Sequence, residues 1–278
     1  MSTFWIAFAF FYLWYATGIA IGYHRLVSHH SYKCKQSFEY FLVLGGYLAY
    51  QGSPIWWTAM HRAHHKHVDT ELDPHSPLFG FWRGYAGWIG PHTLAYPPHI
   101  NPRVQCRDLY KDPLYVFLEQ ENKPLRTAIY LNILVAIVFH ATTSLIFGWQ
   151  VGLAGLIASY VVFQVPLIVN TCCHIPKLGY KGFHSADDSV NVWWLGILAV
   201  GEGWHNNHHA YPGSARSGLR AHEIDFSWMV VRFAKMIGLV SHINEPHELK
   251  QRLNRRRRHG AVARLKRRQE ARQLTSVR

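Results

Sequence analysis

The feature that most constrains this chain is the segregation of its charged residues. The 278-residue sequence has no Asp, Glu, Lys or Arg from Met1 to Tyr23, and none in the 45 residues from Thr127 to Thr171. A helix needs about 20 apolar residues to cross the hydrocarbon core of a bilayer. The first run therefore predicts a membrane-spanning helix over about 3–22, and the second predicts two more, over about 128–147 and 151–171. A single soluble domain is excluded.

The Lys and Arg residues also predict the orientation of the chain. All 29 of them fall in residues 24–126 or 172–278. Cytoplasmic loops carry an excess of these residues, so we expect both stretches on the cytoplasmic side. A third uncharged run, over about 40–60, would place its two flanks on opposite faces if it crossed the membrane. We therefore expect an interfacial or re-entrant helix there, shielded from lipid by protein.

The sequence divides into a membrane-embedded domain, residues 1–249, and a basic tail, residues 250–278. The tail holds twelve Lys or Arg residues and one Glu, so it carries +11 of the net charge of +13. We expect the tail to be disordered near anionic lipid headgroups, and we expect no nucleic-acid binding. The four cysteines form no CxxC motif, and the adjacent Cys172 and Cys173 favour a reducing compartment.

Histidine is unusually frequent, with 20 copies, and many of them are clustered. The spacing HxxHH occurs twice, and residues i, i+3 and i+4 share one face of a helix, so each motif aims two or three imidazoles at one point. An asparagine and a histidine at i and i+4 stand at the end of the last predicted span. The clustered residues are His24 and His29, His61, His64 and His65, Asn170 and His174, and His205, His208 and His209.

About nine imidazoles exceed the roughly four to six ligands of one transition metal, so the clusters predict a two-metal centre. Imidazole suits iron, zinc, copper and nickel alike, but the membrane setting favours a pair of iron ions that use O2 to attack a C–H bond of an acyl chain. A zinc-dependent membrane hydrolase and a metal-binding protein without enzyme activity stay open as alternatives. We expect the remaining histidines, His75 among them, to bind no metal.

The three histidine boxes, with GEGWHNNHHAYP around the last one and DDSVNVWWL before it, carry a resemblance over residues 1 to about 245. This pattern resembles the membrane fatty-acid desaturases, most of all the bacterial-type acyl-CoA delta-9 desaturases of the stearoyl-CoA desaturase family. The resemblance implies an all-α integral membrane protein whose cytoplasmic helical cap holds a di-iron site. It assigns the nine clustered histidines as iron ligands and Asn170 as the holder of a water molecule.

The resemblance implies an enzyme that uses O2 to insert a cis double bond into a saturated fatty acyl chain, with acyl-CoA as the expected substrate and delta-9 as the expected position. A fatty acyl hydroxylase or ketolase of the same superfamily is the alternative. Gln51 and Trp57 match positions of the acyl tunnel, although Trp57 suits interfacial packing equally well. Pro166 and Leu167 stand where the family usually has a Thr-Trp pair at the tunnel bend.

The family usually has four spans, whereas this sequence predicts three. No cytochrome b5 motif is recognisable, so we expect an external donor of ferredoxin or cytochrome b5 type with its reductase. Arg62 and Lys66, beside the second box, are candidates for attracting an acidic donor or for contacting headgroups. The expected location is a multi-pass position in a bacterial inner membrane, with the active site on the cytoplasmic face.

Overall fold

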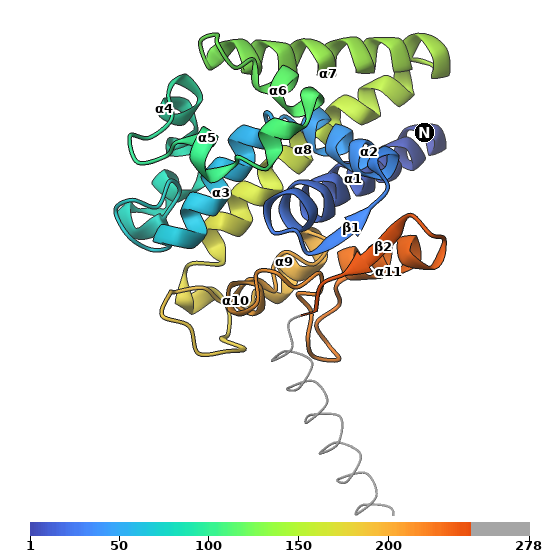
Figure 1. Cartoon of the computed structure of the whole chain (residues 1–278). Helices are drawn as coiled ribbons and strands as arrows, with labels where there is room; N and C mark the ends of the chain where they lie inside the picture. The colour runs from blue at the N-terminus through green and yellow to red at the C-terminus, as the bar shows by residue number, and fades with distance from the viewer. Residues whose placement is uncertain (246–278) are drawn as a thin grey trace, which may run out of the picture. The chain divides into compact units, whose positions relative to one another are not determined.

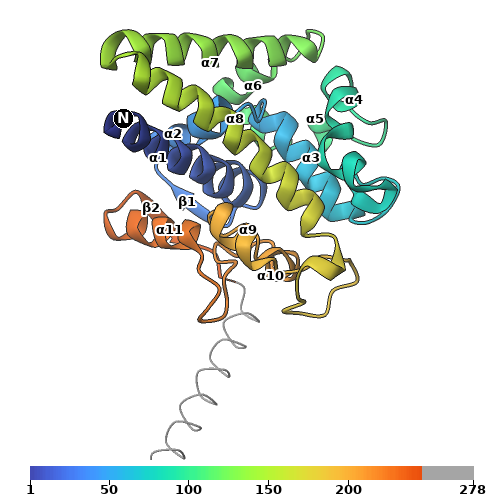
Figure 2. The same cartoon turned by 180° about the vertical axis from the view of Figure 1, so that it is seen from behind.

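The structure is a computed structural model that describes residues 1–245, so the basic tail predicted over 250–278 lies outside the described residues. The described part is mostly helical and contains one small antiparallel sheet, which the all-α prediction did not include (Figures 1 and 2). Its longer elements are α1 (Ser2–Thr17), the π-helical segment η1 (Gly18–Ser28), β1 (Tyr32–Cys34), α2 (Gln36–Leu48), α3 (Pro54–His67), α4 (Ile89–Leu94), α5 (Pro102–Gln105), α6 (Pro113–Glu119), α7 (Arg126–Phe147), α8 (Trp149–Cys172), α9 (Trp193–Leu198), α10 (His205–Ala210), α11 (Phe226–Met236) and β2 (Val240–Ile243). Shorter helical turns lie at Pro77–Phe79, Arg83–Gly87, Leu109–Lys111 and Pro176–Leu178.

Three helices of the described part are long and apolar enough to cross a membrane, as the sequence predicted. They are α1 together with η1, over Ser2–Ser28, then α7 and α8. The first helix runs further than the predicted 3–22, because η1 continues α1 without a break past His24. The charge of Arg25 does not end the helix, since two buried carboxylates pair with its guanidinium.

The helix α8 packs against both α7 and α1 (Figure 2). Its small residues allow the close approach to α7: a Cβ atom on Gly152 would lie 2.6 Å from the backbone oxygen of His140. On the other side, Ala158 and Val162 of α8 share a buried cluster with Phe11 of α1. In a bilayer such small-residue contacts let helices approach each other closely. This packing holds the end of α8, and with it Asn170 and His174, beside the first helix.

The run predicted as one helix over about 40–60 forms parts of two helices, and this corrects the prediction. α2 ends at Leu48 and α3 begins at Pro54. Gly52 has a φ of +73°, a conformation that a helix does not contain. Ser53 then caps α3, because its hydroxyl accepts a hydrogen bond from the backbone N–H of Trp56. The second histidine box therefore stands on a new helix.

The turn between α2 and α3 is covered by protein. Ser53 donates a hydrogen bond to the buried carboxylate of Glu119 at the end of α6. Asn132 of α7 donates to the backbone oxygen of Tyr47, at 2.7 Å. α2 itself packs closely along the first helix, since a Cβ atom on Gly18 would lie 2.5 Å from the backbone nitrogen of Gly46. This covering suits the predicted interfacial or re-entrant position, which stays a prediction.

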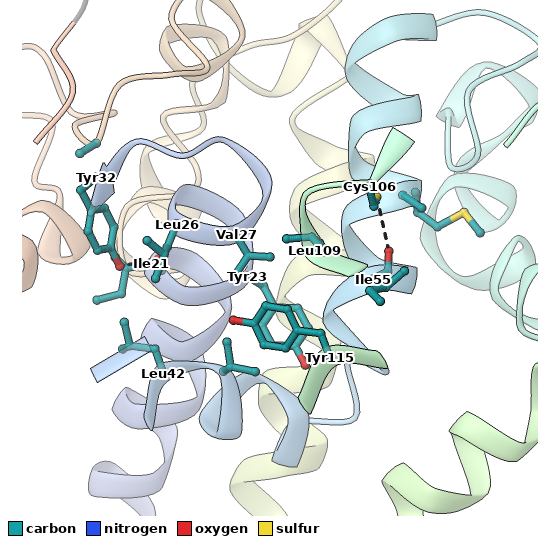
Figure 3. Close-up of a cluster of buried hydrophobic side chains, with 14 of the residues drawn as sticks. Ile21, Tyr23, Leu26, Val27, Tyr32, Leu42, Ile55, Cys106, Leu109 and Tyr115 are labelled. Carbon is teal, nitrogen blue, oxygen red and sulfur yellow. Dashed lines mark hydrogen bonds between the residues drawn. The ribbon is translucent and has the colours of Figure 1, made fainter. Parts of the chain in front are cut away.

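A buried apolar cluster fixes η1 against α3, as Figure 3 shows. Tyr23 lies in this cluster and donates a hydrogen bond from its hydroxyl to the backbone oxygen of Gly52 at 2.9 Å. Tyr32 likewise donates to the backbone oxygen of Ile21 at 2.7 Å. Fully buried side chains in such a cluster have few alternative positions. The first and second histidine boxes are therefore held at a fixed separation.

Candidate metal centre

Nine of the histidines converge in two neighbouring groups. They are the nine that the sequence analysis named as ligands. Within each group, one ring nitrogen of each histidine lies within 4.8 Å of the corresponding nitrogens of the others. The first group contains His24, His29, His61, His65 and His208, and the second contains His64, His174, His205 and His209.

Two short helices each contribute to both groups. The imidazoles of α3 lie on one face, but His61 and His65 belong to the first group and His64 to the second. On α10, His208 belongs to the first group, whereas His205 and its i+4 neighbour belong to the second. Because one helix face serves two groups, the groups must be adjacent. This arrangement suits two metal ions held close together.

In all nine histidines the Nε2 atom faces the centre of its group. In the first group, the Nε2 atoms of His29 and His61 lie 2.7 Å apart. In the second, those of His205 and His174 lie 3.1 Å apart. A neutral imidazole carries one N–H, so hydrogen bonds cannot satisfy this many converging ring nitrogens. The residues therefore fit bound cations, for which neutral imidazole is a ligand.

Four carboxylates hold the outer ring nitrogens of these histidines. Each lies close to an Nδ1 atom: Glu202 to that of His24, Asp73 to that of His64 at 2.9 Å, Asp69 to that of His174 at 3.2 Å, and Asp187 to that of His209 at 3.3 Å. A carboxylate that accepts from Nδ1–H fixes the tautomer and leaves the lone pair on Nε2. Three of the four serve the second group, which gives that group the more negative surroundings.

Sequence reasoning missed these four acids and one further histidine. Glu202 and Asp187 stand within the quoted GEGW and DDSV segments, so their place beside the boxes was a usable signal. His75 was expected to bind no metal, and its buried ring is centred 4.3 Å from that of His64. His64, Asp73 and His75 together form a third potential metal-binding group. That His75 binds no metal stays a prediction.

Burial favours the neutral form of several histidines of the site. Desolvation lowers the pKa of His64 and His205 well below the ordinary histidine value, and neighbouring histidines lower it further. The same causes lower the pKa of His65 to about 3. Metal ligation requires deprotonated imidazole. These three imidazoles therefore favour the form that binds a cation.

A buried arginine links the site to the N-terminus of α11. Arg25 is 1% exposed, and its guanidinium donates to Glu202 at 2.8 Å and to Asp225 at 3.1 Å. Asp225 in turn caps α11 by accepting from the backbone N–H of Trp228. A buried charge with matched partners is costly to disturb. Arg25 therefore fixes Glu202, and through it the ring of His24.

Arg62 has a structural role in addition to the one considered above. Its guanidinium donates to Asp108 at 2.8 Å and to the backbone oxygens of Ser28 and Gln105. These bonds tie the end of η1 to the end of α5 and the segment after it. Its attraction of an acidic donor or its contact with headgroups stays a prediction. Lys66 remains exposed.

Three mostly apolar cavities lie in a row that begins at the histidines, and each shares wall residues with the next. The first, of about 40 Å³, is lined by His24, His61 and His205, and by the buried Ala20 and Val162 of the spans. The second, also of about 40 Å³, has all four predicted tunnel residues, Gln51, Trp57, Pro166 and Leu167, in its wall. A third of about 460 Å³ shares Tyr50, Gln51, Trp56 and Phe163 with the second.

The shared residues show where the cavities meet. Trp57, Pro166 and Asn170 line both the first and the second cavity. The indole of Trp57 donates to the side-chain oxygen of Gln51 at 3.1 Å, and its ring is centred 4.9 Å from that of His61. The third cavity reaches the exposed Ile133 and Tyr160 of α7 and α8. The arrangement can hold a flexible apolar chain against the histidines.

Comparison with known proteins gives consistent results. Residues 3–224 match the family described as "Fatty acid desaturase". The chain is 39% identical over 227 residues to the "sn-1 stearoyl-lipid 9-desaturase" of Anabaena variabilis, which covers 81% of this chain and 78% of that protein. It is 36% identical over 252 residues to the "Delta-9 acyl-lipid desaturase 2" of Arabidopsis thaliana, and the match covers 90% of this chain and 78% of that protein. It is 34% identical over 252 residues to the "Acyl-CoA C20 Delta5-desaturase" of Anemone leveillei, and the match covers 90% of this chain and 77% of that protein.

Proposed function

The chain belongs to the fatty acid desaturase family, and we propose that it introduces a cis double bond at delta-9 of a saturated fatty acyl chain, with O2 as the oxidant, at a di-iron centre. The observation that carries the proposal is the convergence of nine Nε2 atoms into two adjacent groups beside an apolar path. The alternative, a hydroxylase or ketolase, would fit the same geometry. The reaction product distinguishes it from a desaturase.

In this proposal the five histidines of the first group would hold one iron ion and the four of the second group would hold the other. Asn170, which lines the cavity beside them, would hold a water molecule at the centre. With iron bound, the two ions would supply O2 activation and the removal of hydrogen from an unactivated C–H bond. Overall, the acyl chain of the substrate loses two hydrogen atoms. These combine with O2, two protons and two electrons from the donor to give two water molecules.

The residues of the chain have two tasks in this reaction. The carboxylates, Asp73 among them, keep each histidine in the tautomer that presents Nε2. The apolar walls would hold the substrate in reach and exclude water, and the junction of the two cavities at Trp57 and Pro166 would set which carbon pair lies beside the ions. Reaction at a fixed distance from the oxidant makes position a matter of geometry.

The carrier of the acyl chain is proposed to be a bilayer lipid ester in place of the expected CoA thioester. The wide cavity reaches the surface at Ile133 and Tyr160 on two membrane-spanning helices. Among the described residues, no Lys or Arg lines any of the three cavities, so they offer no cation to the phosphates of CoA. Two of the relatives named above are acyl-lipid desaturases, which supports the same assignment.

We also propose that the active site faces the cytoplasm of a bacterial cell and that an external redox protein with its reductase supplies the electrons. The distribution of Lys and Arg supports the orientation. The donor would be of ferredoxin or cytochrome b5 type.

The experiment is analysis of fatty acids by mass spectrometry, with location of the double bond, in cells that express the protein. A delta-9 alkene is expected from the wild type and none from His64→Ala. His242→Ala is the matched control, since this exposed histidine of β2 lies outside both groups. An oxygenated product without an alkene would replace the desaturase by the hydroxylase. Supplying the purified enzyme with labelled glycerolipid or labelled acyl-CoA then decides the carrier.

A further inference from the structure

The helix α11 has two apolar faces, of which only one contacts the protein core. Val231 and Ala234 are buried. Met229, Phe233 and Met236 are spaced i, i+4 and i+7, so they share one face, and all three are exposed, Met236 to 80%. A helix at a water-covered surface needs only the first of these faces to fold. The second face indicates that something apolar covers it.

A neighbouring helix presents the same feature. In α9, Leu195 is buried, whereas Trp193 is 64% exposed and Ile197 is 61% exposed. Large contiguous apolar patches are rare on surfaces that face water. We define the cap surface as six exposed apolar residues of these two helices: Trp193, Ile197, Phe226, Met229, Phe233 and Met236.

The cap surface lies beside the first membrane-spanning helix. Tyr12 donates a hydrogen bond from its hydroxyl to the backbone oxygen of Leu198, at the end of α9, at 2.7 Å. An apolar groove runs between the two parts, with Phe8 and Leu13 of α1 on one side and Ile197 and Phe226 on the other. Tyr12 is ten residues from Ser2, or about 15 Å along the helix, well inside the apolar segment. The medium that surrounds α1 near Tyr12 therefore also contacts the cap surface.

We propose that α9 and α11 are inserted into the bilayer leaflet on the side of the metal centre, with the cap surface in contact with lipid acyl chains. The proposal rests on the membrane location of α1, and it changes the predicted cap from a body in the aqueous phase to one partly embedded in lipid. Continuity with the span and the charges at the edge of α11 single out lipid as the occupant. Arg232 and Lys235 are exposed beside the apolar face, where a cation meets anionic headgroups.

The inserted helices have a consequence for the metal centre. Asp225 caps α11 and pairs with Arg25, which pairs with Glu202 beside His24. A cap anchored in lipid therefore holds the carboxylates and the histidines of the site at a fixed depth. An acyl chain of the same leaflet then reaches the site without leaving the membrane.

The test measures depth with a fluorescent label on single cysteines in the full-length, iron-loaded protein in lipid nanodiscs. Met229→Cys and Phe233→Cys report the cap surface. Lys235→Cys on the same helix and His222→Cys in an exposed loop are the matched controls. All four are made in a Cys34→Ser background, because the other three cysteines are buried. Retention of iron checks that each variant is folded.

Brominated phospholipid and aqueous iodide are the two quenchers. Labels at 229 and 233 are expected to be quenched by brominated lipid several-fold more than labels at 222 and 235, with the reverse order for iodide. Equal quenching by iodide at all four positions would overturn the proposal. Protection of 229 and 233 from both quenchers, together with energy transfer between copies, would replace lipid by a second copy of the chain. Neither result bears on the desaturase reaction, because the readout is location alone.

Discussion

Replacement of Asp187 by asparagine should weaken metal binding at the second histidine group and leave the first group intact. Asp187 lies against the Nδ1 atom of His209 at 3.3 Å. Loss of such an outer carboxylate typically lowers metal affinity about 10- to 100-fold. Asp69 and Asp73 remain beside the same group, and the contact between Asp187 and His209 is longer than the 2.9 Å between Asp73 and His64. We therefore expect a loss of affinity at the lower end of this range. That is about tenfold, or about 1.4 kcal/mol.

The structure also predicts how the loss of metal affinity differs between related variants. Asp73→Asn removes the shorter contact, and its side chain is fully buried, so we expect a loss nearer 100-fold. Asp188→Asn is the matched control, since the neighbouring Asp188 is exposed and its backbone N–H, not its side chain, makes the recorded hydrogen bond, to Asp69. It should leave affinity unchanged.

The assay is equilibrium dialysis of metal-free protein against Fe²⁺, with bound iron counted per chain. The wild type should bind two ions, and the two site variants should lose one of them at low free iron while the other stays bound. The reasoning is refuted if Asp188→Asn weakens binding as much as Asp187→Asn, or if both ions are lost together. Circular dichroism distinguishes loss of metal from loss of the fold.

Four further predictions follow from the fold and the cavities. A reporter fused after Glu39 and one fused after Asp69 should lie on the same side of the membrane; opposite sides would make residues 40–60 a true span. Leu167→Trp should shift chain length or double-bond position in the fatty-acid profile, because the indole would fill a cavity of about 40 Å³, whereas Leu153→Trp, on the exposed side of α8, should not. Gly18→Val should destabilise the protein by about 1–3 kcal/mol in thermal unfolding, since its Cβ atom would lie 2.5 Å from Gly46, and Gly90→Ala, with open space around it, is the control. Purified protein should be inactive with NADPH alone and gain activity when a ferredoxin or cytochrome donor and its reductase are added; turnover without them would contradict the external donor.

Local patterns carried much of what the sequence predicted. A charge-free run of bilayer length is a property of consecutive residues, so the three long helices were predictable. The spacing HxxHH is equally local, because one helical turn brings i, i+3 and i+4 to one face. These patterns selected the nine histidines that the fold brings together. The same patterns predicted one helix over about 40–60, whereas two positive φ angles, at Tyr50 and Gly52, separate α2 from α3.

Tertiary contacts decided the rest. The histidines of α3 and of α10 divide between two groups because of how these helices cross. Residue spacing within one helix carries no information about that crossing. Asp69 and Asp187 are far apart in the sequence, yet both meet histidines of the second group. His75 and Arg62 each acquired a place that residue type alone did not indicate. The sequence by itself therefore determined which residues are available for a metal centre in a membrane, because those signals are periodic and local. Only the tertiary structure decided how they divide, what orients them and which surface meets lipid, because these depend on packing between segments distant in the chain.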